Sequence, residues 1–456
     1  MLRSINPATG RELATFPELD EAGIEAAIEK AYETRHAWRD AGLDARSALL
    51  RSVAGVLRAD KSRFAAMMTA EMGKPIIEAE AEVEKCAWTA AWLADNAARL
   101  LADEPVESNA TNSYVRFQPL GVVLAVMPWN FPFWQALRAG LPALAAGNWI
   151  LLKHASNVPQ CALAVEDVFR EAGFPDGVFQ TLLIGPGPVE RIIADRRVAG
   201  VTLTGSEAAG AKVAAAAGKA IKKSVLELGG SDPFIVLEDA DVAMAATVGC
   251  RARNQNNGQS CIAAKRFVVV DSVADEFESR FSAAVGSLKV GDPMDRTHQF
   301  GPLARADLLD DLERQVDRSV AMGARVLIGG KRIDGAGNYF QPTVLADVRA
   351  GMPVYNEETF GPVAAVIRVK DEEQALRVAN DSDFGLGSAI WTKDIDRGRR
   401  LAERVEAGLV FINGMVGSDA RLPFGGVKKS GYGRELSGYG IKEFVNLQTV
   451  WVGPAK

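Results

Sequence analysis

Hydrophobic residues in the first part of the chain recur every three or four positions, which is the spacing of one face of an α-helix. In the stretch DEAGIEAAIEKAYE, Ile24 and Ile28 share such a face, and acidic residues stand in its first turn. The same period runs through residues 46–73, where it ends at a glycine, and again through residues 80–101. The sequence therefore predicts a short extended entry followed by helices.

The hydrophobic pattern changes to that of β-structure beyond this helical segment. Residues 113–119 alternate like a strand, and residues 121–128 form an apolar run bounded by glycine and proline. Strand-like and helix-like runs then alternate, and a second such series begins near residue 240. This alternation predicts parallel sheets covered by helices, in two α/β units. The strand-like tail EFVNLQTVWVG is expected to pair with residues 107–120 or with a neighbouring subunit.

Composition excludes some classes of protein and leaves others open. At 456 residues the chain is long enough for several domains. Its 52 basic and 58 acidic residues are interspersed, so no basic block favours nucleic acid as a partner. No apolar run approaches the roughly 20 residues that span a bilayer, and the first residues lack a signal-peptide core. We therefore expect no membrane contact and a cytoplasmic location.

Cysteine and histidine usage limits the chemistry. The four cysteines include no C-x-x-C pair, which argues against a disulfide framework and against a metal site. Only three histidines are present, at positions 36, 154 and 298. If a cysteine acts as a nucleophile, we therefore expect a residue other than histidine to act as the base.

Two residues are candidates for the chemistry. Cys261 lies in NNGQSCIAAKR, a polar, glycine-containing segment before an apolar run, and the pattern allows either a nucleophile or a small buried side chain. Glu227 lies in LELGGSDPF at a strand end, between two leucines. Burial there would raise its pKa toward the range of a general base, whereas a solvated position would leave it ordinary.

Three further motifs are typical of a ligand site but are weak alone. In VTLTGSEAAG a strand runs into a helix through Gly205 and Ser206, and a helix N-terminus suits a pyrophosphate. In PWNFP two prolines fix Asn130, whose amide is a suitable oxyanion donor. Lys153 ends a strand, where α/β sheets bind ligands. A ligand-free turn, a turn asparagine and a surface lysine are the respective alternatives.

These motifs all occur in one chain, in the order in which the segments are given below. Together they make the chain resemble the NAD(P)-dependent aldehyde dehydrogenase superfamily over essentially its whole length. The segments that carry the resemblance are INPATGRELATFP, PWNFP, GNWILLKHAS, TLTGSEAAG, LELGGSDPFIV, NNGQSCIAAKR, NEETFGPV and PFGGVKKSGYGRE.

The resemblance implies an α/β fold with three parts. A Rossmann-type dinucleotide-binding domain is expected in residues 1–106 and 121–229, and a second α/β domain, the catalytic one, in residues 230–442. Residues 107–120 and 443–456 are expected to form a small β oligomerisation arm. A homodimer or homotetramer follows from that arm.

The resemblance also implies roles for individual residues. Cys261 would be the catalytic thiol and Glu227 the general base, and Asn130 with the Cys261 backbone N–H would form the oxyanion hole. NAD or NADP would be held by residues from both expected domains: Trp129, Lys153, Ser156, Gly205, Ser206, Leu228, Glu358 and Phe360. This chemistry requires no metal, in keeping with the few histidines.

Two positions favour an aldehyde with a distal carboxylate. Arg138 and Ser418 match the arginine and serine of the succinate-semialdehyde dehydrogenase branch, and an arginine fork is a good partner for a carboxylate. A structural ion pair is the alternative for Arg138, and Arg421 is a secondary candidate. We expect succinic semialdehyde as substrate. Another small or aromatic aldehyde, a CoA-acylating reaction and a non-enzymatic binding protein on the same scaffold are the alternatives.

Two departures from relatives bear on mechanism. Many NAD-selective members carry a glutamate where this chain has Ser156, so a charge that would repel a 2′-phosphate is missing and both cofactors are expected to work. Some relatives carry a glutamate near the C-terminus where this chain has Asn446. A second acidic relay is therefore in doubt, and deacylation is expected to depend on Glu227.

Overall fold

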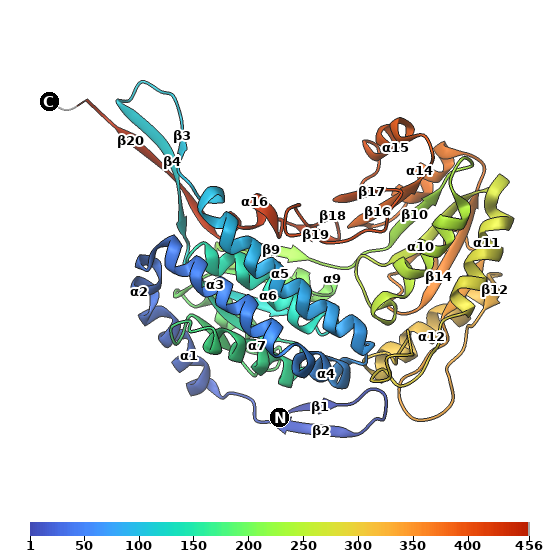
Figure 1. Cartoon of the computed structure of the whole chain (residues 1–456), viewed down its shortest axis with the longest axis horizontal. Helices are drawn as coiled ribbons and strands as arrows, with labels where there is room; N and C mark the ends of the chain where they lie inside the picture. The colour runs from blue at the N-terminus through green and yellow to red at the C-terminus, as the bar shows by residue number, and fades with distance from the viewer. Residues whose placement is uncertain (455–456) are drawn as a thin grey trace.

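The computed structural model describes residues 1–454, which form two α/β lobes and a projecting β arm (Figure 1). The first lobe contains a six-stranded sheet with the order β19-β9-β8-β5-β6-β7. The second lobe contains a seven-stranded sheet with the order β12-β13-β14-β11-β10-β16-β17. Both predicted α/β units are therefore present.

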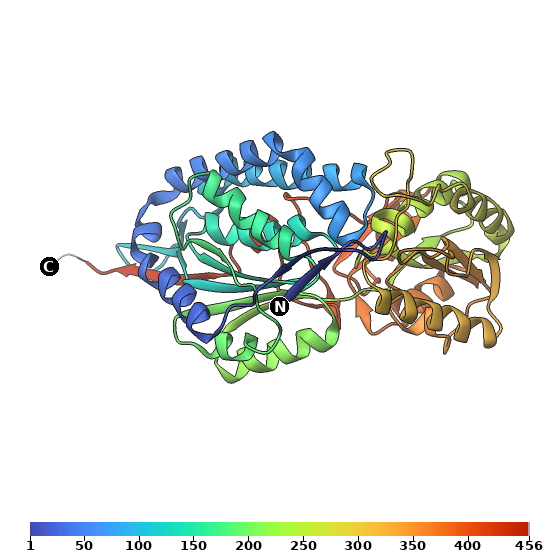
Figure 2. The ribbon, with the colours of Figure 1, turned by 90° about the horizontal axis from the view of Figure 1, so that it is seen from below.

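The sheet of the first lobe is parallel from β9 to β7, as the alternating pattern predicts, and only the edge strand β19 is antiparallel. Every residue of β6 is buried, because helices cover both faces and the strand reads as one apolar run (Figure 2). The strands are β5 (Val122–Met127), β6 (Trp149–His154), β7 (Phe179–Thr181), β8 (Val198–Thr204), β9 (Lys223–Glu227) and β19 (Gly431–Tyr432).

The helices of the first lobe follow the predicted apolar faces, with one difference. The predicted helix over residues 46–73 is two helices, because Asp60 leaves helical geometry at φ −105° and ψ 18°. Gly73, at φ +82°, ends the second of them. The helices are α1 (Glu21–Glu33), α2 (Arg35–Asp40), α3 (Gly42–Ala59), α4 (Lys61–Met72), α5 (Ile76–Leu100), α6 (Pro132–Ala145), α7 (Pro159–Glu171), α8 (Val189–Ala194) and α9 (Glu207–Lys219).

The second lobe has a parallel sheet whose edge strand β12 is antiparallel to β13. Its strands are β10 (Asp232–Val236), β11 (Ala264–Val270), β12 (Arg325–Ile328), β13 (Thr343–Ala346), β14 (Val363–Val369), β16 (Gly387–Trp391) and β17 (Leu409–Ile412). Its helices are α10 (Val242–Asn254), the 3-10 turn η1 (Gln255–Gly258), α11 (Asp271–Gly286), α12 (Ala306–Ala321), α13 (Pro353–Asn356), α14 (Glu372–Asn380) and α15 (Ile395–Ala402).

Each lobe has its own hydrophobic core. In the second lobe, Phe234 and Val236 of β10 belong to one cluster and Ile235 to another, so successive residues point to opposite faces of the sheet. The first lobe has one large cluster that joins its helices to its strands. No helix within residues 1–454 is long and apolar enough to cross a membrane.

The arm is a three-stranded sheet with the order β20-β4-β3, built from β3 (Glu104–Pro105), β4 (Asn112–Pro119) and β20 (Val445–Val452). The C-terminal strand pairs with β4 along its whole length, from Val445 opposite Pro119 to Val452 opposite Asn112. The predicted pairing of the tail with the earlier strand is therefore confirmed within one chain. Residues 455 and 456 of the predicted arm lie outside the described part.

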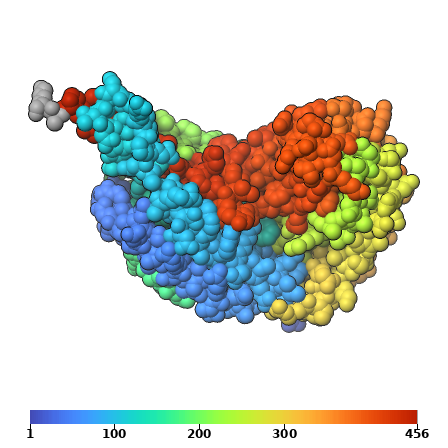
Figure 3. Space-filling model, turned by 45° about the horizontal axis from the view of Figure 1, so that its top comes forward, coloured from blue at the N-terminus to red at the C-terminus, as the bar shows by residue number. Residues whose placement is uncertain are grey.

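Smaller elements connect these parts. The antiparallel pair β1 (Leu2–Ile5) and β2 (Glu12–Phe16) forms the extended entry, and β15 (Phe384–Gly385) pairs with β18 (Val427–Lys428). The short helix α16 (Ser437–Gly440) precedes β20. On the face seen in Figure 3, segments near the C-terminus run across the middle of the molecule, over part of both lobes, and continue to the arm.

Candidate active site

Cys261 follows a sharp turn between α10 and β11. Asn256, Asn257 and Gly258 all have left-handed backbone conformations, with φ of 55°, 57° and 72°. The Asn257 amide donates at 2.8 Å to the Gly73 carbonyl of the first lobe and at 2.8 Å to the Pro302 carbonyl of the second, which anchors the turn to both. A Cβ at position 258 would lie 2.5 Å from the backbone of Gly361, so glycine is required there.

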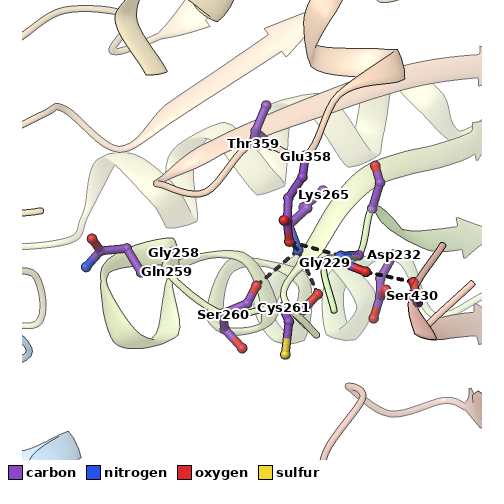
Figure 4. Close-up of polar contacts among 12 residues, drawn as sticks. Gly229, Asp232, Gly258, Gln259, Ser260, Cys261, Lys265, Glu358, Thr359 and Ser430 are labelled. Atoms are coloured by element: carbon purple, nitrogen blue, oxygen red, sulfur yellow. Dashed lines mark hydrogen bonds and ion pairs between the residues drawn. The ribbon is translucent and has the colours of Figure 1, made fainter. Parts of the chain in front are cut away.

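A buried lysine fixes the backbone of the thiol-bearing residue. The Lys265 ammonium, fully buried on β11, donates to the Ser260 carbonyl at 3.0 Å and to the Cys261 carbonyl at 2.7 Å. It also lies 3.4 Å from the Glu358 carboxylate (Figure 4). The sulfur of Cys261 points away from these contacts. Lys265 thus connects the nucleophile segment to Glu358, and the sequence reasoning missed it.

Two cavities meet at Cys261. The first, here called the α5–α6 cavity, has a volume of about 320 Å³ and is lined by residues that include Lys85, Trp134, Arg138 and Ser418. The second, here called the sheet-edge cavity, has a volume of about 330 Å³ and lies beyond the ends of β8 and β9. Cys261 lines both cavities. A group bound in either one therefore lies beside the same thiol.

The surroundings of Cys261 favour the protonated form of its thiol. Burial raises the pKa of the Cys261 thiol to about 11, while the positive charges of Arg138 and Lys265 act in the opposite direction. A nucleophilic thiolate therefore requires a base or a change of surroundings. None of the three histidines lines either cavity.

Glu227 lies at the end of β9 with only 2% of its surface exposed. Neither of its carboxylate oxygens has a hydrogen-bond partner among the described residues 1–454. Burial, together with the negative charge of Glu435, raises the pKa of Glu227 well above its usual value. Of the two alternatives that the sequence left open for Glu227, the structure therefore has the buried one, with the raised pKa that burial causes.

The Glu227 carboxylate lines neither cavity in this structure, although its neighbour Leu228 lines the sheet-edge cavity. It packs against Gly425, where an added Cβ would lie 2.6 Å from one carboxylate oxygen. The second buried carboxylate beside it, Glu435, was missed in the sequence. The only feature of the sequence that pointed to Glu435 was an acidic residue between Arg434 and a leucine near the C-terminus.

Asn130 is buried beside the thiol segment and lines the sheet-edge cavity. Its side-chain amide donates to the Gln259 carbonyl at 3.1 Å, and its backbone carbonyl accepts from the Asn256 side-chain amide at 2.8 Å. One bond fixes the carboxamide and the other fixes the backbone, as the flanking prolines predict.

Most of the residues predicted to hold a dinucleotide lie together. Those that line the sheet-edge cavity are Trp129, Gly205, Ser206, Leu228, Glu358 and Phe360. The Ser206 hydroxyl caps α9, accepting from the Ala209 N–H at 3.4 Å, so the helix begins at the cavity. Trp129 and Phe360 contact edge to face with ring centroids 5.7 Å apart.

Lys153 and Ser156 do not line this cavity. Lys153 is the next-to-last residue of β6, the strand beside β5, and burial lowers the pKa of its ammonium. Ser156 follows in the loop before α7 and is half-buried. Both lie at the carboxyl end of the parallel sheet, the edge at which such sheets bind ligands.

Arg138, on α6, lines the α5–α6 cavity and is almost fully buried. It forms an ion pair with Glu435, donates to the Thr204 hydroxyl at 3.3 Å and stacks 4.4 Å above the Phe424 ring. The structural ion pair that was the alternative interpretation is therefore present. Ser418 lines the same cavity, whereas Arg421 does not and pairs with Asp419 at 2.6 Å.

Comparison with known proteins identifies the family that this chain resembles. Residues 1–450 match the model of the aldehyde dehydrogenase family. The chain is 53% identical over 451 residues to a probable succinate-semialdehyde dehydrogenase, NADP(+), from Synechocystis sp., with 99% of each chain covered. It is 50% identical to the succinate semialdehyde dehydrogenase, NAD(P)+, of Escherichia coli K12, covering 98% of this chain and 97% of the other.

The chain belongs to the aldehyde dehydrogenase family. The resemblance inferred from its motifs is thereby confirmed. The fold agrees as well, because the structure of succinic semialdehyde dehydrogenase from Streptococcus pyogenes in complex with NADP+ covers this aldehyde dehydrogenase completely, with a TM-score of 0.97 and 40% identity. Its substrate class is therefore a small aldehyde.

Proposed function

We propose that this aldehyde dehydrogenase oxidises succinic semialdehyde to succinate, with NADP or NAD as oxidant. The observation that carries the proposal is the position of Cys261, which lines a cavity with cationic and hydroxyl groups on one side and a cavity at the end of a parallel sheet on the other. Relatives at about half identity are named for this activity, which supports the choice of aldehyde.

The sheet-edge cavity fits a dinucleotide. Free N–H groups at the start of α9 suit a pyrophosphate, and the Glu358 carboxylate suits ribose hydroxyls. Lys153 and Ser156, on the adjoining strand end, would face the adenosine ribose. This assignment makes residues 1–106 and 121–229 the dinucleotide-binding domain and residues 230–442 the catalytic domain.

In the proposed reaction the Cys261 thiol loses its proton to solvent, and the resulting thiolate adds to the aldehyde carbon and forms a thiohemiacetal. The Asn130 amide and the Cys261 N–H donate to the oxygen on which negative charge develops. A nicotinamide, when bound, supplies the acceptor for the hydride that leaves this carbon. The Cys261 thioester that remains is then open to attack by water.

Glu227 is the base that removes a proton from this water. Its unpaired, desolvated oxygens favour proton uptake, since no hydrogen bond holds the charged form. The side chain must turn from Gly425 toward the thiol to act, because it lines neither cavity in this structure.

The proposed substrate is tested by a panel of aldehydes assayed by formation of reduced nicotinamide. We expect kcat/KM for succinic semialdehyde to exceed that for butanal by about tenfold or more, because charge-assisted hydrogen bonds contribute about 1.5–3 kcal/mol. The product is succinate, with no acyl-CoA formed when coenzyme A is added. Equal kcat/KM for the two aldehydes would refute the proposed substrate.

Cofactor choice is expected to depend on Ser156. Replacing Ser156 by glutamate should raise the KM for NADP by about tenfold or more, because a carboxylate would repel the 2′-phosphate. The KM for NAD should change far less, and Ser156→Ala is the matched control that adds no charge. Parallel changes in both Michaelis constants would place Ser156 away from the 2′-position.

The arm is proposed to join subunits into a homodimer or homotetramer. Its edge strand β20 exposes Leu447 at 61% and Trp451 at 53%, which is apolar surface that a second chain would cover. Light scattering on the purified protein tests this, and a monomer at micromolar concentration would contradict it.

A further inference from the structure

The α5–α6 cavity is lined by two cations without an acidic partner among residues 1–454. Of its lining residues, Arg138 pairs with Glu435, whereas Lys85 and Arg251 form no ion pair. Arg251 is exposed, so water solvates its charge. Lys85, on α5, is largely enclosed, and burial followed by the nearby charge of Arg138 lowers the pKa of its ammonium to about 8.

The contacts of Lys85 leave its charge uncompensated. Its ammonium donates to the Ser418 hydroxyl at 2.5 Å and lies 4.3 Å from the centroid of the Trp134 ring. Both partners are neutral, and an ammonium has three donors. An ammonium held in this way favours the binding of an anion, because the attraction between the two charges offsets the free-energy cost of removing the ammonium from water.

The nearest acidic groups are already occupied. The Glu82 carboxylate pairs with Lys74 and accepts from the backbone N–H groups of Phe133 and Trp134 at 2.9 Å each. The Asp419 carboxylate pairs with Arg421 at 2.6 Å. Glu78, the other carboxylate that lines the cavity, accepts from the Asn256 N–H at 2.6 Å and lies near the charge of Arg251. Within residues 1–454 none of these carboxylates pairs with Lys85, and a ligand would be the group that completes the site.

Arg138 shares its charge with a protein carboxylate. It pairs with Glu435, which is itself buried. Removing Arg138 would leave that carboxylate buried and unpaired, so a loss of activity in such a variant would not report on substrate binding alone.

We propose that Lys85, together with Ser418, binds the distal carboxylate of the aldehyde substrate. The inference rests on the proposed function and deepens it by assigning the recognition of the carboxylate to α5. Arg138, which pairs with Glu435, lines the same cavity, and Cys261 reaches the aldehyde end of the same molecule.

The experiment compares Lys85→Met with Lys85→Arg, each assayed on succinic semialdehyde and on butanal. For Lys85→Met we expect the ratio of kcat/KM for the acidic aldehyde to that for the neutral one to fall by about tenfold or more, through KM rather than kcat. Lys85→Arg should recover most of this ratio. A methionine variant that retains the wild-type ratio would overturn the proposal.

A matched control removes the other unpaired charge of the cavity. Arg251→Met takes one positive charge from the exposed side, where solvent screening reduces its effect. We expect a smaller fall in the ratio than for Lys85→Met. An equal or larger fall would move the carboxylate site from Lys85 to Arg251.

Inhibition by succinate tests whether Lys85 binds carboxylates, independently of which aldehyde the enzyme oxidises. Succinate should compete with butanal in the wild type and about tenfold more weakly in Lys85→Met. This result would stand even if succinic semialdehyde proved a poor substrate. Equal inhibition of both proteins would show that Lys85 does not bind carboxylates, whatever aldehyde is oxidised.

Discussion

Replacing Cys261 by alanine is expected to lower aldehyde oxidation by about four orders of magnitude or more, since removing a catalytic nucleophile has effects of this size or larger. No other cysteine lines either cavity, so no second thiol is placed to form the thioester. Formation of reduced nicotinamide from a saturating aldehyde measures the loss.

Cys250 provides the control for this experiment. It lies on α10 and lines neither cavity, and Cys250→Ala should keep kcat near that of the wild type. Thermal shift should show that Cys261→Ala still folds and still responds to added dinucleotide. A Cys261→Ala enzyme that kept a tenth of the wild-type rate would refute the covalent mechanism.

The raised pKa of the Cys261 thiol gives the expected direction of the pH dependence of its alkylation. Burial raises the pKa of Cys261 to about 11, and the reactive form is the thiolate. The fraction of thiolate therefore grows as pH rises toward this value, and alkylation of the free enzyme by iodoacetamide should accelerate between pH 6 and pH 9. The Cys261→Ala protein serves as the blank.

Replacing Glu227 by glutamine is expected to slow steady-state turnover by about 10² to 10⁴-fold, the usual contribution of a general base. Glutamine keeps the shape of the side chain but cannot accept the proton of the attacking water. Acylation of Cys261 should persist, so rapid mixing should show a burst of reduced nicotinamide that approaches one per active site.

Mass spectrometry identifies the species behind such a burst. The Glu227→Gln protein mixed with aldehyde and dinucleotide should gain the mass of one acyl group, located on the peptide that contains Cys261. Glu190→Gln, on the exposed surface of α8, is the control and should turn over normally. A slow variant without a burst would place Glu227 before the hydride-transfer step instead.

Much of the fold follows from local patterns. The apolar run WILLKH predicts β6, and Ser206 caps α9 where the strand–turn–helix pattern places the start of a helix. The break at Asp60 was missed, because the apolar face continues through both helices. The local signal is Asp60 itself, since aspartate is favoured at the start of a helix, but the continuous periodicity outweighed it.

The sequence motifs contain the main candidate residues of the site, but they do not show which distant residues pair in the folded chain. Cys261, Glu227 and Asn130 each lie in a distinctive segment, whereas Arg138 and Glu435 are almost three hundred residues apart and meet only in the folded chain. Lys85 and Lys265 look like ordinary lysines in the sequence. Their importance comes from burial and from the carbonyls or hydroxyls around them.

The two connections between the lobes run side by side. The chain leaves the first lobe after Glu227 and returns before β19, and the Leu228 N–H donates to the Ser430 carbonyl at 2.9 Å while the Ser430 hydroxyl donates to the Gly229 carbonyl at 2.7 Å. The two connections are thus hydrogen-bonded to each other where the chain crosses between the lobes. Since Glu227 lies just before this crossing and Cys261 lies on the lobe beyond it, these bonds help to fix how the proposed base and the proposed nucleophile face each other.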